Sequence, residues 1–333
     1  MGVAQDKSAL VAALPKACSD ELAAVEFIER QRWGAEPACP RCGVPEVNQM
    51  KARDGSRNAR FLWRCLGCKE QFTVRIGTVF EDSRIPLRHW CYAFWAACAS
   101  KKGVSALQIK RQTGLSYKSA LFLMHRIRFA MTPDRQPRLS GTVEVDETYV
   151  GGKPRKPSIQ KLRTMSYTER KPYWDERVSH TGRGTKKTPV VALLERGGNV
   201  RAQVVTDVTS ATLKRAIRQQ VRPESRIMTD ELASYKGIGK AFAGGHHTVR
   251  HSVREYAIGD VHVNTAESFF SLLKRGLIGT FHAVSKKHLH RYVNEFAFRW
   301  NTRKLDDGAR TLAAIQGAEG KRLTYREPRK GVS

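Results

Sequence analysis

The stretch Val143-Glu-Val-Asp-Glu-Thr-Tyr-Val-Gly-Gly-Lys153 alternates apolar and polar residues and ends in two glycines. This pattern predicts a β-strand that ends in a turn and carries carboxylates along its middle. Because successive side chains of a strand point to opposite faces, Glu144 and Asp146 share one face and Glu147 points to the other. An aspartate in a strand is more often a local hydrogen-bonding residue than a metal ligand, so the strand alone leaves its function open.

Two further carboxylates accompany other predicted elements. Asp230 follows the run Arg226-Ile-Met-Thr229, which predicts a short buried strand, and Glu231 stands beside it. Glu267 opens a predicted helix over residues 264–277. Three carboxylates on three separate elements could converge on metal ions. We interpret Glu147 and Glu231 as hydrogen-bonding neighbours of the site.

The helix that carries Glu267 has two distinct rows of side chains. Its apolar row consists of Ala266, Phe270, Leu273 and Leu277. Its polar row consists of Asn264, Glu267, Ser271 and Lys274, at steps of three or four residues that bring them onto one face. Lys274 can therefore contact a phosphate near Glu267, although a solvated helix face with an incidental pair of charges is the alternative.

Carboxylates in this arrangement suit phosphodiester chemistry. Two Mg²⁺ or Mn²⁺ ions can activate an attacking water or 3′-hydroxyl and neutralise the leaving oxygen. Such hard cations prefer oxygen ligands, and carboxylates leave coordination positions open for the phosphate. His262 could approach the same site, but a lone histidine near a strand end is more often structural.

The charge of the chain indicates a polyanionic partner. The 333 residues carry a formal net charge of +28, with the excess Lys and Arg spread along the whole length. A broad basic surface neutralises phosphates, so nucleic acid is the expected partner, and a merely soluble basic surface is the alternative. The longest apolar run, residues 90–99, would cross only half a bilayer. We therefore expect a cytoplasmic, nucleoid-associated protein with no membrane partner and with reduced cysteines.

Four cysteines form two C-x₂-C pairs, Cys39/Cys42 and Cys65/Cys68, separated by 22 residues. This spacing is typical of a zinc ribbon, in which two tight turns supply four thiolates to one structural Zn²⁺. Phe61, Trp63, Phe72 and Val74 alternate like short strands around the pairs. A redox dithiol pair is the alternative. Cys91 and Cys98 are interpreted as small buried apolar residues.

A basic helical pair follows the zinc ribbon. Residues 104–112 and 117–131 predict two helices, joined by Thr113-Gly-Leu-Ser116. A short helix, a glycine turn and a Ser-capped basic helix are typical of a helix-turn-helix, and an ordinary αα-hairpin is the alternative. We expect Lys118, Arg126 and Arg128 on the second helix to contact DNA.

The remaining chain predicts an α/β unit. An amphipathic helix is expected over residues 19–34 with Ser19 as its cap, and a linker over residues 131–140. A hairpin joins residues 189–195 and 200–205, helices follow at 209–221 and 288–303, and residues 248–252 are a further candidate strand. These elements favour a mixed sheet flanked by helices. The polar segment 153–188 has the length of a functional or mobile loop.

The whole order of motifs resembles bacterial insertion-sequence transposases of the IS1595 type with an ISXO2-like catalytic domain. The resemblance rests on the zinc ribbon, the helical pair, Asp146-Glu-Thr-Tyr-Val-Gly-Gly-Lys153, Thr229-Asp-Glu231 and His262-Val-Asn-Thr-Ala-Glu-Ser268, and it covers nearly the whole chain. It implies an RNase H-like fold with a DDE triad that cleaves DNA at terminal inverted repeats and transfers the strands. It also implies a dimer or larger assembly on double-stranded DNA.

Carried over by position, the resemblance assigns Asp146, Asp230 and Glu267 as catalytic metal ligands and Lys274 as the basic residue that follows them. Some relatives place Asn at the third position, which makes Asn264 a competitor. We choose Glu267 because it stands seven residues before Lys274. The predicted domains are residues 1–80 (helix and zinc ribbon), 81–135 (helix-turn-helix), 141–305 (catalytic) and 306–333 (tail). Two other functions remain open: a DNA-binding regulator that lacks activity, and a general nuclease.

Overall fold

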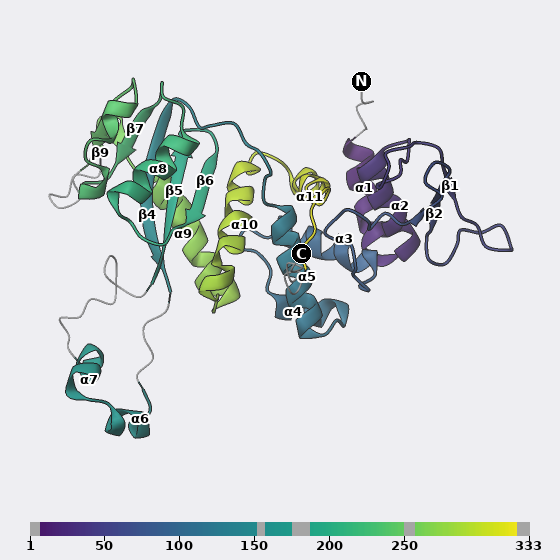
Figure 1. The fold of residues 1–333 in the computed structure, drawn as a ribbon, viewed down its shortest axis with the longest axis horizontal. Coiled ribbons are helices and arrows are strands. Elements are labelled where there is room, and N and C mark those ends of the chain that lie inside the picture. Colours follow the sequence, from purple (N-terminus) through teal and green to yellow (C-terminus); the bar gives the residue numbers. More distant parts are fainter. Residues whose placement is uncertain (1–6, 152–156, 175–186, 250–256, 325–333) are drawn as a thin grey trace, which may run out of the picture. The chain divides into compact units, whose positions relative to one another are not determined.

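A computed structural model describes residues 7–151, 157–174, 187–249 and 257–324. The chain divides into two compact units. Unit 1 comprises Met1–Gln136, Gly279–Phe281 and Asn294–Ser333, and unit 2 comprises Pro137–Ile278 and His282–Val293. Figure 1 shows the mostly helical elements of unit 1 and the sheet of unit 2. No helix in the described ranges is both long and apolar enough to cross a membrane.

Unit 1 is built on packed helices. They are α1 (Lys7–Ser19), α2 (Glu21–Trp33), α3 (Leu87–Ala99), α4 (Ala106–Thr113), α5 (Tyr117–Ala130) and α11 (Asp307–Gln316). Their shared core includes Phe27, Trp90 and Leu123. The predicted start of α2 is corrected: Asp20, not Ser19, is the cap, because its carboxylate accepts the Ala23 N–H at 2.7 Å. Ser19 ends α1, a helix that the sequence analysis did not predict.

The zinc-ribbon sheet has three short antiparallel strands, β1 (Val47–Gln49), β2 (Trp63–Cys65) and β3 (Gln71–Phe72), with β2 in the centre. Trp33 at the end of α2 packs edge-on against Trp63 and Phe72. The Trp63 indole N–H also donates to Glu29 of α2 at 2.7 Å. The small sheet is thus joined to the helices through aromatic packing and a partly buried hydrogen bond.

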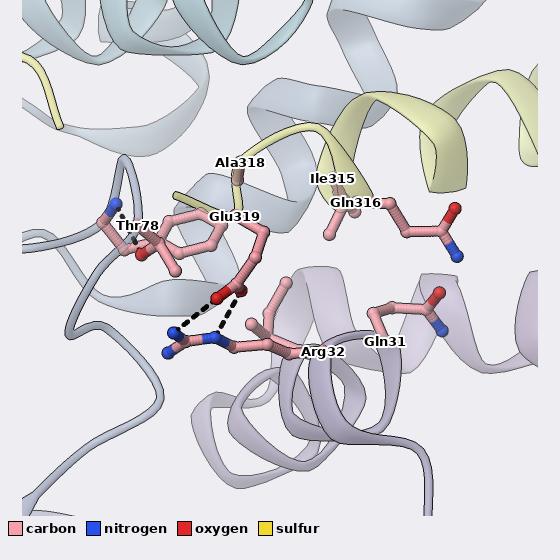
Figure 2. A pocket seen from close by; sticks show the side chains of 9 residues that line it. Gln31, Arg32, Thr78, Ile315, Gln316, Ala318 and Glu319 are labelled. Atoms are coloured by element: carbon pink, nitrogen blue, oxygen red, sulfur yellow. Dashed lines mark hydrogen bonds and ion pairs between the residues drawn. The ribbon is translucent and has the colours of Figure 1, made fainter. Parts of the chain in front are cut away.

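The end of the chain returns to unit 1. The predicted tail from residue 306 instead begins with α11, capped by Asp306, whose carboxylate accepts the Ala309 N–H at 2.7 Å. Glu319 then forms a two-pronged ion pair with Arg32 of α2, beside a cavity of about 140 Å³ (Figure 2). The C-terminal segment therefore closes the helical unit, and the predicted frayed residues 325–333 lie outside the described ranges.

Unit 2 contains a five-stranded mixed sheet in the order β6-β5-β4-β7-β8. Its strands are β4 (Thr142–Val150), β5 (Thr188–Glu195), β6 (Val200–Val204), β7 (Arg226–Thr229) and β8 (His246–Thr248). β4, β5 and β6 pair antiparallel, whereas β7 pairs parallel with both β4 and β8. The prediction of a mixed sheet flanked by helices is confirmed, and the hairpin of β5 and β6 lies where it was expected.

Unit 2 also contains helices and a second, two-stranded sheet. They are α6 (Ile159–Thr164), α7 (Tyr167–Trp174), α8 (Ser210–Gln220), the short hairpin β9 (Ala257–Ile258) and β10 (Val261–His262), and α9 (Asn264–Gly276). A further helix, α10 (Leu289–Asn301), belongs to both units: its residues up to Val293 lie in unit 2 and those from Asn294 lie in unit 1. Two short helices thus lie inside the predicted 153–188 loop, of which residues 152–156 and 175–186 are outside the described ranges. Most of the predicted strand 248–252 is also outside them.

The two faces of β4 have different chemistry. Val143 and Val145 are fully buried in a cluster with Leu213 and Ile217 of α8. The alternate residues Glu144 and Asp146 face the other side, as strand geometry requires, and there Glu144 bonds to α9. The apolar side chains of β4 thus fix α8 on one face, and the acidic side chains face α9.

Candidate functional site

The pairing of β4 with β7 brings Asp146 beside Asp230. Val145 pairs in register with Thr229, so the next residue of each strand is an aspartate. Neighbouring strands lie about 4.8 Å apart, and parallel strands leave the sheet in the same direction. The two aspartates therefore occupy corresponding positions at the end of β7. This juxtaposition depends on the sheet register, since the residues are separated by 84 positions in the chain.

The environment of Asp146 is electrostatically unfavourable for a negative charge. Burial, the neighbouring charge of Glu147 and the charges of Asp230 and Glu267 together raise the pKa of Asp146 to about 7. One hydrogen bond from the Glu147 backbone N–H, at 2.7 Å, acts in the opposite direction. Asp146 therefore interacts electrostatically with both of the other predicted metal ligands, Asp230 and Glu267. A cation bound between these carboxylates would offset their repulsion.

The helix α9 presents Glu267 as the sequence pattern indicated. Its polar row of Asn264, Glu267, Ser271 and Lys274 is exposed. Its apolar row of Ala266, Phe270, Leu273 and Leu277 is buried, together with Phe269. The amphipathic prediction for this helix is confirmed. Both Glu267 and its competitor Asn264 lie in the first turn of α9.

The neighbouring acids have different surroundings. The Glu147 carboxylate accepts a hydrogen bond from the Tyr235 hydroxyl at 2.8 Å, which agrees with its predicted hydrogen-bonding role. Glu231 is exposed. Glu144 is completely buried and forms bonds to α9, a role that the sequence analysis missed because its partners are about 120 residues away. His262 lies with its Nδ1 3.3 Å from a Glu144 carboxylate oxygen.

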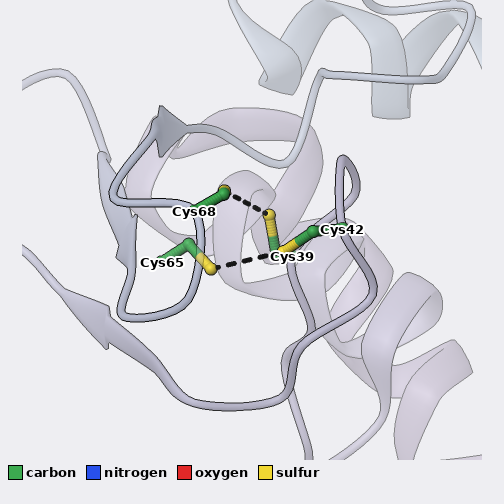
Figure 3. A group of neighbouring side chains, drawn as sticks. All are labelled: Cys39, Cys42, Cys65 and Cys68. Atoms are coloured by element: carbon green, nitrogen blue, oxygen red, sulfur yellow. Dashed lines mark hydrogen bonds between the residues drawn. The ribbon is translucent and has the colours of Figure 1, made fainter.

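The four paired cysteines form the second candidate site. Their sulfur atoms all lie within 4.8 Å of one another, with Cys39 3.8 Å from Cys68 and Cys42 3.6 Å from Cys65 (Figure 3). Burial raises the pKa of the Cys39 thiol, but backbone N–H groups of Cys42 and Arg41 and the neighbouring thiols outweigh this effect and lower the pKa to about 7. Four converging sulfurs without a free position fit a structural Zn²⁺ ion.

The two candidate sites differ in compactness. Across the described ranges, the four cysteines are the only group of three or more metal-binding side chains with ligand atoms this close together. Asp146, Asp230 and Glu267 are electrostatically coupled but more widely spaced. The oxygen donors of these carboxylates fit Mg²⁺ or Mn²⁺, whereas the sulfur donors of the cysteines fit Zn²⁺.

The helical pair α4–α5 has the predicted arrangement of two helices and a tight turn. Gly114 adopts a left-handed conformation with φ 72°, which ends α4, and Ser116 caps α5 by accepting the Ser119 N–H. Lys118 is exposed in the first turn of α5. This turn is the part of a second helix that reads DNA in helix-turn-helix proteins.

The expected DNA contacts of Arg126 and Arg128 are corrected by the structure. Arg126 is 5% exposed, and its guanidinium donates to the backbone carbonyls of Val79, Glu81 and Leu323. Arg128 is 1% exposed, and its Nε donates to Glu295 at 2.6 Å. Both arginines bind their own chain in the interior of unit 1. Helical spacing in the sequence did not predict that these arginines are buried, because α5 is covered on nearly all sides after its first turn.

Comparison with known proteins gives two kinds of similarity. Residues 138–301 match the ISXO2-like transposase domain, and residues 19–71 match the transposase zinc-ribbon domain of the IS1595 type. A protein of the transposable element ISH50 from Halobacterium salinarum is 30% identical over 283 residues, which are 84% of this chain and 90% of the relative. A transposase-like protein from Haemophilus influenzae is 31% identical over 102 residues, which are 31% of this chain and 80% of the relative.

The zinc ribbon, the mixed sheet and these similarities define a transposase. More narrowly, the chain belongs to the family of IS1595-type transposases, with a zinc-ribbon domain followed by an ISXO2-like transposase domain. The family prediction made from the sequence motifs is thereby confirmed.

Proposed function

We propose that the protein is a DDE transposase that binds the terminal inverted repeats of its element, cleaves the DNA there and joins the freed ends to target DNA. The observation that carries this proposal is the register of β4 and β7, which sets Asp146 beside Asp230. Further support comes from the strand order, with three antiparallel strands followed by two parallel ones, which is the arrangement of an RNase H-like fold.

In this proposal Asp146, Asp230 and Glu267 hold two divalent cations, Mg²⁺ or Mn²⁺. When bound, such ions activate the attacking oxygen and neutralise the charge on the leaving oxygen. The chain itself supplies the remaining functions. The sheet holds the two aspartates side by side, Glu267 would complete the ligand set from the first turn of α9, and Lys274, exposed two turns along the same face, would bind a phosphate of the DNA.

DNA recognition is assigned to unit 1 and to the basic surface of the chain. The zinc ribbon and the α4–α5 helix-turn-helix would bind the transposon ends, with Lys118 in the first turn of α5 as a contact. The described residues 157–174 of the segment 153–188, which include α6 and α7, would contact DNA. In this proposal the protein is cytoplasmic and associated with the nucleoid, and its substrate is double-stranded DNA. Pairing of two ends calls for a dimer or larger assembly on DNA.

Strand cleavage tests this proposal. Purified protein is incubated with Mg²⁺ and a DNA fragment that carries the inverted repeats flanking its gene. Asp146→Asn, Asp230→Asn and Glu267→Gln should each lower the cleavage rate at least about 1000-fold, because each removes a ligand of ions that stabilise the transition state by several kcal/mol. Binding to the same fragment should persist.

Two controls make the result specific. Glu224→Gln removes an exposed carboxylate elsewhere in unit 2 and should cleave like the wild type. Asn264→Ala distinguishes the competing third ligand, and loss of cleavage here with retention in Glu267→Gln would move the assignment to Asn264. Cleavage by Asp146→Asn at the wild-type rate would refute the triad, and end binding without any Mg²⁺-dependent cleavage by the wild type would favour a regulator.

A further inference from the structure

The buried carboxylate of Glu144 connects β4 to the first turn of α9. One oxygen, Oε2, accepts the backbone N–H groups of Thr265 at 2.8 Å and Ala266 at 3.1 Å. The other oxygen, Oε1, accepts the Thr265 hydroxyl at 2.9 Å. The side chain is 0% exposed, so water does not compete for these bonds. Charge-assisted bonds of this kind are roughly twice as strong as neutral ones.

These bonds take the place of an ordinary helix cap. The residue before α9 is Val263, which has no side-chain oxygen and provides no side-chain cap. The first N–H groups of a helix need acceptors from outside the helix, and a carboxylate also interacts favourably with the positive end of the helix dipole. In α9 the acceptor comes from a strand 121 residues earlier in the chain. The start of the helix is therefore fixed to the sheet and not to its own preceding loop.

Arg196 holds the Glu144 carboxylate in place. Its Nε donates to Oε1 at 2.8 Å, and its Nη2 donates to the His262 carbonyl at 3.1 Å. Its backbone N–H donates to the Thr142 carbonyl of β4 at 3.0 Å. The arginine thus joins the end of β5, the strand β4 and the chain that leads into α9. It also supplies the positive charge that a buried carboxylate requires.

The sequence positions of these groups connect them to the proposed catalytic site. Glu144 lies two residues before Asp146 on the same face of β4. Ala266, whose N–H it binds, is followed directly by Glu267. A displacement of the first turn of α9 would therefore change the separation of Asp146 and Glu267.

We infer that Glu144 is a positioning residue for the metal site, which sets the separation between the Asp146 and Glu267 ligands by fixing the start of α9 to β4. The inference rests on the proposed assignment of these two residues as metal ligands. Residues that orient metal ligands change metal affinity by about 10–100-fold when they are mutated.

Mn²⁺ binding to the zinc-loaded, full-length protein tests the inference without requiring a DNA substrate. Free Mn²⁺ is measured by electron paramagnetic resonance as the ion is titrated into each variant. Glu144→Gln keeps the size of the side chain but replaces one accepting oxygen with an amide NH₂ group, which can only donate. We expect its Mn²⁺ affinity to fall at least about 10-fold, whereas Thr265→Val, which removes only the hydroxyl bond, should lose about 2- to 3-fold.

A matched control separates positioning from general loss of stability. Leu213→Ala truncates a fully buried side chain of α8, which packs on the opposite face of β4. It should lower the melting temperature but leave Mn²⁺ affinity unchanged. Higher Mn²⁺ concentration should also restore plasmid nicking by Glu144→Gln to near the wild-type maximum, because the ligands themselves are intact.

The possible outcomes are distinct. Wild-type Mn²⁺ affinity in Glu144→Gln, together with weakened binding in Asp146→Asn, would overturn the positioning role and leave the proposed metal site standing. An equal loss in Leu213→Ala and Glu144→Gln would also overturn it, since the effect would then follow stability. Mn²⁺ binding that is unchanged by Asp146→Asn would refute the metal site and, with it, the inference.

Discussion

The cysteine site of unit 1 and the carboxylate site of unit 2 are both candidate metal sites, but they are assembled in opposite ways. The cysteines come from two tight turns within 30 residues, and their sulfurs lie within 4.8 Å of one another. The carboxylates come from β4, the end of β7 and α9, and span more than 120 positions in the chain. The cysteine ligands are already gathered, whereas the carboxylates are coupled but spaced more widely.

The chemistry of the ligands explains this difference. Protonated thiols are neutral and can approach one another without a metal. They release their protons and become thiolates when the ion binds. Carboxylates repel one another when they are ionised, and the raised pKa of Asp146 reflects its burial together with the like charges around it. The gathered thiols therefore suit a structural site, whereas the carboxylates of the proposed catalytic site are spaced more widely, which limits the repulsion between their like charges.

The largest expected effect on folding comes from a substitution that removes one cysteine ligand of the proposed zinc site. Cys39→Ser should reduce bound zinc from about one ion per chain to almost none and unfold the zinc ribbon, because metal binding supplies about 10–16 kcal/mol to such small modules. Zinc content by atomic emission and protease resistance of residues 35–75 provide the measurements. Cys18→Ser, outside the cluster, should retain zinc. A folded Cys39→Ser ribbon without metal would remove the distinction between the two sites.

A second prediction concerns a buried carboxylate that the protein neutralises with its own cations. Glu295 is 0% exposed and is paired with Arg128 at 2.6 Å and Arg299 at 2.5 Å. Glu295→Ala would leave two buried guanidinium groups without their anion, and we expect a loss of about 3–5 kcal/mol in the free energy of unfolding. Denaturant titration measures it. A loss below about 1 kcal/mol would show that these charges are not effectively buried.

The opposite response is expected at Asp146, whose neighbours carry the same charge. Its pKa is about 7 in the folded protein against an ordinary value of 3.8, so the folded state retains a proton that the unfolded chain releases between these values. Stability from this group is fully present below about pH 4 and is lost as pH rises through about 7.

Without divalent metal, Asp146→Asn should therefore be more stable than the wild type at pH 8, by about 2 kcal/mol, with a difference that shrinks toward pH 4. Melting curves of the zinc-loaded proteins from pH 4 to pH 8 measure this difference, and Glu224→Gln serves as the control. Equal pH profiles for Asp146→Asn and the wild type would mean that burial and like charges do not disfavour the ionised form of Asp146.

The smallest expected effect is on DNA binding, and it compares an exposed cation of α5, Lys118, with a buried one, Arg126. Lys118→Ala should weaken DNA binding by about 3- to 10-fold and lower the slope of log affinity against log salt by about one, because one phosphate contact is lost. Its melting temperature should stay near that of the wild type. Arg126→Ala should instead lower stability, since it leaves three backbone carbonyls without their donor. The reverse pattern would restore Arg126 as a DNA contact.

The sequence by itself determined those features that depend on short spacing. The two C-x₂-C pairs gave the cysteine site, alternation gave β4, and steps of three and four gave the two rows of α9. Local geometry relates the residues within each cysteine pair, along β4 and along α9. The two cysteine pairs are related to each other by a spacing that is typical of a zinc ribbon.

Tertiary structure alone decided which charged groups are internal and which elements meet. The burial of Arg126 and Arg128 follows from elements far away in the chain that cover α5. The link from Glu144 to α9 follows from the arrangement of β4 and α9. The placement of Asp146 beside Asp230 follows from the pairing of two distant strands. Residue type and local period do not encode such contacts, because burial and register are set by the packing of the whole unit.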